Sequence, residues 1–117
     1  MSTTSVGRGG EARAEAYLME RGYTLLRRNY RSGPREIDLI MQDGETLVFV
    51  EVKSRSKTGY GTPGEFVTPA KRRLLTLAAQ AFLIETGKTD VLARFDVVEV
   101  YLGTDRISHI ENAFDAI

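Results

Sequence analysis

The residues with the clearest chemistry lie in two β-rich segments, 36–41 and 46–53, on either side of Gln-Asp-Gly-Glu. The first segment carries Asp38, and the second ends in Glu51-Val-Lys53. An Asp-Gly pair between two such segments predicts a β-hairpin with a tight turn. Two carboxylates and a lysine are therefore expected on neighbouring strands.

The register of this hairpin decides whether the two acids meet. If Asp43 and Gly44 are the two turn residues, Asp38 lies opposite Phe49 and diagonal to Glu51. Diagonal neighbours have Cα atoms about 7–8 Å apart, so their side-chain tips can converge. Because side chains alternate along a strand, one face should carry Glu36, Asp38, Phe49, Glu51 and Lys53. The other face should be core, formed by Ile37, Leu39, Val48, Val50 and Val52.

This carboxylate pair has two interpretations. It can hold one hard divalent cation through oxygens at about 2.1 Å, with Lys53 in reach of the same spot. Alternatively, charges on one face and β-branched residues on the other are typical of a half-solvated edge hairpin. Three carboxylates beside a single lysine favour the cation, because like charges destabilise one another without a counterion.

The rest of the chain must supply the elements that position these residues. Helices are expected over 10–21 and from the N-cap Thr68, with Pro69 at the first helical position, to about Glu85. Further strands are expected over 24–28, 94–101 and 106–110, with loops over 31–35 and 54–67. The expected order is α-β-β-β-α-β-β, an α/β fold with a mixed sheet flanked by helices, in one domain over residues 1–117.

Composition limits the classes of protein to consider. Hydrophobic residues make up 42% and charged residues 27% of the 117 residues, as in ordinary globular proteins. No apolar run approaches the roughly 20 residues that cross a bilayer, so no membrane partner is expected. The first ten residues lack the apolar stretch of a secretory signal. The absence of cysteine excludes disulfides, thiolate zinc sites and a cysteine nucleophile, and fits a cytoplasmic protein.

The charge is zero overall but unevenly distributed. From Arg27 to Arg73 there are ten Lys and Arg against six Asp and Glu, whereas from Glu85 onward there are three against seven. Two of the six central acids are the candidate metal ligands, whose charge a bound cation would cancel. The middle of the chain is therefore the part expected to face phosphate, although solvated surface charge explains the same composition.

Motifs in four segments resemble a known family. Asp38, a gap of 12 residues and then Glu51-Val52-Lys53 resemble the PD-(D/E)-x-K motif of the restriction-endonuclease-like superfamily. The chain also contains, in order, Gly7-x-x-Gly-Glu-x-x-Ala-x-x-Tyr-Leu18, Glu36-Ile-Asp-Leu-Ile40, Phe49-Val-Glu-Val-Lys-Ser-Arg55 and Arg94-Phe-Asp-Val-Val98. Together these resemble the bacterial YraN-type family of predicted endonuclease-like proteins and, more distantly, archaeal Holliday junction resolvases. Arg35 departs from the pattern, since many relatives have glycine there, which we interpret as a changed turn before the strand.

The resemblance implies a metal-dependent nuclease acting on DNA. Asp38 and Glu51 would ligate Mg²⁺ or Mn²⁺, with the main-chain carbonyl of Val52 as a third ligand. Lys53 would orient the attacking water or offset charge in the transition state. Glu11 matches a helical acid of resolvase-like members and would complete the metal shell through water. An acid near a helix start is also favoured by the helix dipole, which is the alternative for Glu11.

Basic residues supply the candidate contacts to phosphate. Lys71-Arg72-Arg73 fall in the first turn of the second helix, where the dipole disfavours cations, so a bound anion is indicated. A solvated run is the alternative for these three, and Lys71 is the candidate for a second basic group in the catalytic site. Further candidates for backbone contacts are Arg27, Arg28, Arg31, Arg55 and Lys57. Tyr30 and Tyr60 either stack on bases or pack, and His109 is assigned no chemistry.

Three functions remain open at this point. A metal-dependent nuclease or resolvase-like enzyme comes first, because a pure binding protein has no need of a clustered acid pair. A nucleic-acid-binding module that uses the same fold without cleavage is the alternative, and a protein-interaction domain is the third. The sequence does not decide between DNA and RNA or the substrate's structure, and it leaves a homodimer open.

Overall fold

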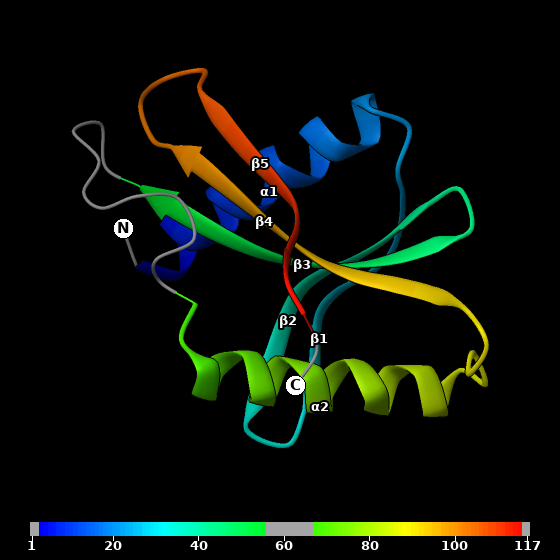
Figure 1. The fold of residues 1–117 in the computed structure, drawn as a ribbon. Helices are drawn as coiled ribbons and strands as arrows, with labels where there is room; N and C mark the ends of the chain where they lie inside the picture. Colours follow the sequence, from blue (N-terminus) through cyan, green and yellow to red (C-terminus); the bar gives the residue numbers. More distant parts are fainter. Residues whose placement is uncertain (1–2, 56–66, 116–117) are drawn as a thin grey trace.

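The computed structural model describes residues 3–55 and 67–115. The elements follow the expected order α-β-β-β-α-β-β (Figure 1). They are α1 (Thr3–Glu20), β1 (Thr24–Ser32), β2 (Arg35–Asp43), β3 (Thr46–Arg55), α2 (Pro69–Glu85), β4 (Leu92–Tyr101) and β5 (Ile107–Phe114). The prediction of a mixed α/β fold is therefore confirmed.

The five strands form one sheet in the order β1-β2-β3-β4-β5. Strands β3 and β4 are parallel, while the other neighbours are antiparallel. A parallel pair needs a crossover connection, and α2 lies within it. The two helices cover different faces of the sheet (Figure 1), each over its own buried cluster. Leu75 and Phe82 of α2 pack with Phe49, whereas Leu18 of α1 packs with Val50.

Neither helix is long and apolar enough to cross a membrane, as far as the described residues go. The start of α2 is as predicted: Thr68 is the N-cap, and its hydroxyl accepts a hydrogen bond from the backbone N–H of Lys71 at 3.2 Å. Pro69 occupies the first helical position. This fixed start determines which way the side chain of Lys71 can point.

The predicted register of the β2–β3 hairpin is wrong by two residues. Asp43 pairs with Thr46, so Gly44 and Glu45 form the turn. Gly44 has a φ of 61°, and glycine at the first of two turn positions is what a type II′ turn requires. Asp38 is therefore in line with Glu51 rather than diagonal to it. Because the displacement is an even number of residues, the alternation of faces survives it.

The predicted faces hold for most of the hairpin. Leu39, Val48 and Val50 join the cluster beneath α1, and Phe49 packs on the α2 side. Ile37 is the exception, because it belongs to the α2 cluster. Pairing of β2 with β3 ends at Leu39–Val50, and beyond that point β2 accompanies β1 alone toward α2 (Figure 1).

Several elements are longer than predicted. Helix α1 begins at Thr3 rather than residue 10, although glycines disfavour a helix there. Strand β1 continues to Ser32, which pairs with Arg35 across a two-residue turn at Gly33-Pro34. Arg35 is the first residue of β2 and directly follows this turn.

Candidate active site

The site is built where β2 and β3 separate. Strand β3 continues to Arg55 with β4 as its partner, while the start of β2 pairs only with β1. Backbone groups on this edge of β3 lose their partners in the sheet, and buried groups of that kind need replacements. Asp38 supplies one: its Oδ2 accepts a hydrogen bond from the Val52 N–H at 2.7 Å. The Asp38 side chain therefore lies against β3 at the point where β2 and β3 separate.

Asp38 and Glu51 share a hydrogen bond at this fork. Burial raises the pKa of Asp38 to about 9, helped by the hydrogen bond with Glu51 and by the charge of Glu51. The N–H of Val52 acts in the opposite direction but is outweighed. At neutral pH the Asp38 carboxyl thus keeps its proton, and its O–H group donates a hydrogen bond to Glu51. The raised pKa of Asp38 and the lowered pKa of Glu51 indicate one proton shared between a half-buried and a buried carboxyl group.

Glu51 is the ionised member of the pair. Burial would raise its pKa, but hydrogen bonds from Asp38 and Lys71, with the charges of Lys71 and Lys53, lower it overall. The Lys71 Nζ lies 2.5 Å from Glu51 Oε2. This ion pair brings Lys71 of α2 into the site. It also offsets the unfavourable interaction between the Lys71 charge and the helix dipole in the first helical turn.

Lys53 is the second ammonium group at the pair. Its pKa is lowered by burial, by hydrogen bonding with Lys71 and by the charge of Lys71, which outweigh the opposing charges of Glu51 and Asp38. For Lys71 the balance is reversed: burial lowers its pKa, but Glu51 raises it more. Of the two lysines, Lys53 gives up its proton more readily.

Glu11 approaches the pair from α1. The helix packs so closely on β3 that a Cβ at Gly10 would overlap the Oγ of Ser54. The charge of Glu11 contributes to the raised pKa of Asp38, which places the two carboxyl groups within electrostatic reach. The carboxylate of Glu11 accepts a hydrogen bond from the side-chain amide of Asn29 at 2.8 Å.

Glu36 does not join the pair, contrary to the expectation of three carboxylates with one lysine. Its carboxylate lies 3.3 Å from Arg31 Nε. The pair has two lysines instead, Lys53 and Lys71, because helix α2 adds the second one. With two lysines beside them, the acids repel one another less and have less need of a metal ion.

The other predicted phosphate contacts are scattered over the surface. Arg28 makes a two-point ion pair with Glu15 at 2.7 and 2.9 Å, although 62% of its side chain is exposed. Arg31 is also exposed. Arg27 lies over the ring of Tyr30, which is buried and packs on Phe82 rather than standing free for a base. Lys57 and Tyr60 lie outside the described residues.

Three more arginines lie near the ends of β3 and α2. Arg55 pairs with Glu99 at 2.9 Å, and its side chain is 20% exposed. Arg73 is exposed, whereas Arg72 is half-buried and its Nε has no hydrogen-bond partner among the described residues. Arg72 and Arg73 therefore directly follow Lys71, the residue that reaches Glu51.

Two buried polar groups escaped the sequence reasoning. Glu99 is 1% exposed, and the strand register sets it beside Lys53. Asp96 is fully buried and is contacted by Arg94 Nε at 2.9 Å, His109 Nε2 at 2.7 Å and the Asn112 N–H at 3.0 Å. These hydrogen bonds outweigh burial and lower the pKa of Asp96. Acids inside the apolar segment 95–100 were the available signal in the sequence, and Asp96 ties β5 to β4.

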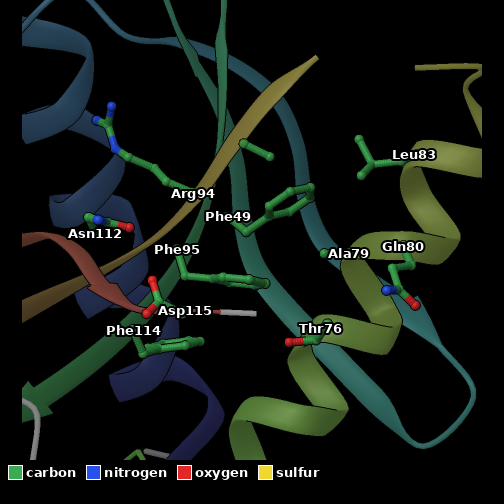
Figure 2. A pocket seen from close by; sticks show the side chains of 11 residues that line it. Phe49, Thr76, Ala79, Gln80, Leu83, Arg94, Phe95, Asn112, Phe114 and Asp115 are labelled. Atoms are coloured by element: carbon green, nitrogen blue, oxygen red, sulfur yellow. The ribbon is translucent and has the colours of Figure 1, made fainter. Parts of the chain in front are cut away.

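A separate pocket of 260 Å³ lies between α2 and the far part of the sheet (Figure 2). Phenylalanine rings of β3, β4 and β5 meet side chains of α2 there, including Phe49, Phe95, Phe114, Thr76 and Leu83. The rings of Phe95 and Phe114 stack with centroids 4.8 Å apart. Neither acid of the shared-proton pair lines this pocket.

The donor set fits Mg²⁺ or Mn²⁺ only in part through side chains. Within residues 3–55 and 67–115, no three His, Cys, Asp or Glu side chains form a group that could hold a metal ion. Mg²⁺, however, commonly takes one or two carboxylates and keeps several waters. Asp38 and Glu51 meet that requirement once their shared proton is lost, and the carbonyl of Val52 is the third candidate.

The geometry defines a class of protein: a mixed α/β fold with a carboxylate pair and two lysines at a fork in its sheet. The model of a family described as uncharacterised protein family UPF0102 matches residues 10–100. The chain belongs to this family, which confirms the YraN-type resemblance at the level of the family.

Similar relatives are also UPF0102 proteins. The one from Symbiobacterium thermophilum is 50% identical over 114 residues, which cover 95% of this chain and 97% of the relative. The one from Desulfosudis oleivorans is 47% identical over 110 residues, with 94% and 89% covered. The one from Geobacter sulfurreducens is 46% identical over 113 residues, with 94% and 88% covered.

Proposed function

We propose that this protein is a nuclease that hydrolyses phosphodiester bonds in DNA with Mg²⁺ or Mn²⁺ bound at Asp38 and Glu51. The observation that carries the proposal is the meeting of these two carboxyl groups at the fork, where Asp38 accepts the Val52 N–H and Glu51 contacts Lys71. A pair that cannot ionise fully by itself becomes a dianion when a divalent cation replaces the proton. Two acids at a fork in a sheet are thus suited to hard-cation binding.

The carboxyl groups and one backbone carbonyl of the site would hold the metal. Asp38, Glu51 and the Val52 carbonyl would hold the metal, and Glu11 would reach its shell through water. A metal held there would supply Lewis-acid chemistry for the attack of water on the phosphate. To bind the metal, Asp38 and Glu51 would both ionise and release their shared proton to solvent.

The lysines would act on the substrate's charge. Lys71 keeps Glu51 ionised through its contact at 2.5 Å. Lys53, whose pKa is lowered, either orients the attacking water or donates to a phosphate oxygen as negative charge develops. Both ammonium groups belong to the acid pair's surroundings, so they would adjoin any phosphate bound there.

Exposed arginines support nucleic acid as the substrate. Arg28 and Arg31 hold exposed ion pairs with carboxylates, which contribute little to stability and can be exchanged for phosphate contacts. Arg73 adds an exposed cation in the same helical turn as Lys71. Contacts of this kind recognise the phosphate backbone rather than a base sequence.

The alternative is a module that binds nucleic acid without cleaving it. One observation favours it: Glu51 already has Lys71 as a counterion, and Asp38 is neutral at pH 7. In this reading the acids and lysines are a satisfied polar cluster and need no metal. Lys71, Arg72 and Arg73 would still contact phosphate.

A cleavage screen separates the two functions. Branched, flapped, single-stranded and duplex DNA are incubated with the protein and Mn²⁺, alongside Asp38→Asn and the exposed control Asp90→Asn. The nuclease predicts cleavage of at least one substrate by the wild type and by Asp90→Asn, with none by Asp38→Asn. Binding without cleavage of any of the four substrates would favour the non-cleaving module.

A further inference from the structure

Asn29 has a left-handed backbone conformation in the middle of β1. Its φ is 49°, in the left-handed region, and Asn112 is the other non-glycine residue with a positive φ in the described ranges. Glycine adopts this conformation without the steric cost of a Cβ. Asparagine is one of the few residues with a Cβ that tolerate this conformation, and it adds a side-chain amide that glycine lacks.

The amide of Asn29 lies between two acids from different elements. Its Nδ2 donates a hydrogen bond to Glu11 Oε1 of α1 at 2.8 Å and approaches Glu36 Oε1 of β2 at 3.5 Å. The charge of Glu11 in turn acts on Asp38. Asn29 thus contacts Glu11, and the charge of Glu11 reaches Asp38 of the carboxylate pair.

The chemistry of this bridge differs from that of neighbouring acids. Glu15 and Glu36 each face an arginine, Arg28 and Arg31, which neutralises their charge. Glu11 is instead held by an amide, which orients a carboxylate without cancelling its charge. A carboxylate held in this way keeps its full attraction for a cation.

There is also open space beside these groups. A pocket of 260 Å³ is lined by Glu11, Ala12, Glu15, Arg28, Asn29 and Leu39. Glu11 therefore borders a volume that water can enter, although Asp38 and Glu51 do not line it. The amide fixes the carboxylate at the edge of that volume.

We propose that Asn29 is a positioning residue for the metal centre, which orients Glu11 so that its carboxylate binds the water shell of a divalent cation held by Asp38 and Glu51. The inference rests on the proposed function. Partners that orient groups around a metal commonly change affinity by about 10- to 100-fold when removed. Because Asn29 acts through an outer contact, the lower end of that range is expected.

The test measures Mn²⁺ affinity by calorimetry in wild type, Asn29→Gly, Glu11→Gln and the double variant. Asn29→Gly removes the amide but keeps a residue suited to the left-handed backbone, so its melting temperature should not fall. Its Mn²⁺ dissociation constant should rise by about 10-fold. In the Glu11→Gln background the same change should have no further effect, because the amide then has no carboxylate to orient.

Asn112→Gly is the matched control. Asn112 has a φ of 50°, and its backbone N–H bonds to Asp96 in a different part of the sheet. Its substitution tests the effect of relaxing a left-handed asparagine, and Mn²⁺ affinity should stay at the wild-type value. Equal affinity in wild type and Asn29→Gly, or an undiminished effect in the Glu11→Gln background, would overturn the inference alone. A wild type that binds no Mn²⁺ would overturn the proposed function and the inference with it.

Discussion

At the scale of single residues, the shared proton makes Asp38 a group that costs stability at neutral pH. The pKa of Asp38 in the folded protein, about 9, lies above its ordinary value of 3.8. The folded state therefore binds more protons than the unfolded state between these values. The contribution of Asp38 to stability is complete below pH 3.8 and is lost as pH rises toward 9.

Asp38→Asn should remove that loss. The asparagine amide can still donate to Glu51, and its oxygen can still accept the Val52 N–H. Without metal, the variant should be at least as stable as the wild type at pH 8, with a flatter dependence between pH 5 and 9. The difference should be on the order of 1 kcal/mol per pH unit at most. Urea unfolding at several pH values measures it, and a steeper dependence in the variant would contradict the shared proton.

Lys53 separates an enzyme from a binding protein. Lys53→Ala should leave metal affinity roughly intact while reducing turnover by on the order of 10²-fold or more. Lys53→Arg should not rescue fully, because a planar guanidinium does not replace a compact ammonium. Lys88→Ala, after the end of α2, is the control. Steady-state cleavage of the best substrate from the screen measures these rates, and unchanged turnover in Lys53→Ala would remove its catalytic role.

At the scale of elements, close packing of α1 on β3 is what brings Glu11 to the site. Gly9 and Gly10 are neighbours in the same helix but differ in their surroundings: nothing lies within 4 Å of a Cβ at Gly9, whereas one at Gly10 would meet Ser54 Oγ. Gly9→Ala should therefore stabilise the protein by roughly 0.5–1 kcal/mol, as alanine does inside a helix.

Gly10→Ala should lose most or all of that gain, because Ser54 must leave its rotamer. Adding Ser54→Ala should restore the gain, since the Cβ of residue 54 is at an ordinary contact distance of 3.5 Å. Thermal unfolding of the three variants and the wild type gives the comparison. Equal stabilisation by Gly9→Ala and Gly10→Ala would mean that α1 does not press on β3.

The elements also show what could be predicted from sequence and what could not. The alternation of residues 36–53 was enough to predict which face carries Asp38, Glu51 and Lys53, since an even error in register leaves faces unchanged. The fork was not predictable, because it depends on where β2 stops pairing with β3. Lys71 was a candidate only on charge, and its contact with Glu51 needed the crossover that α2 makes.

The contact of Asn29 with Glu11 was also not predictable from the sequence. An asparagine near basic residues in a strand is typical of a surface position. The contact of Asn29 with Glu11 spans 18 positions in the chain. Hydrogen bonds of this kind follow from how α1 lies across the sheet rather than from local pattern. The same is true of Glu99, whose neighbour Lys53 is set by the parallel pairing of β3 with β4.

At the scale of the whole molecule, a net charge of zero means that phosphate binding depends on where the cations lie. Nucleic-acid binding should weaken steeply with salt, because each phosphate contact releases counterions. Replacing Lys71, Arg72 and Arg73 together should reduce the slope of log affinity against log salt by up to about three units. Binding curves at several salt concentrations give the slope, and no change would mean that the start of α2 does not touch phosphate.

The central claim is that a divalent cation exchanges with the proton shared by Asp38 and Glu51. The most direct test is calorimetric titration of Mg²⁺ into the wild type and Asp38→Asn at pH 6.5 and 8.5, in two buffers that differ in ionisation enthalpy. The account predicts binding at millimolar Mg²⁺ or below, tighter at pH 8.5, with a proton released to the buffer and no binding by Asp38→Asn. Absence of binding to the wild type at millimolar Mg²⁺, or equal binding by both proteins without proton release, would contradict it.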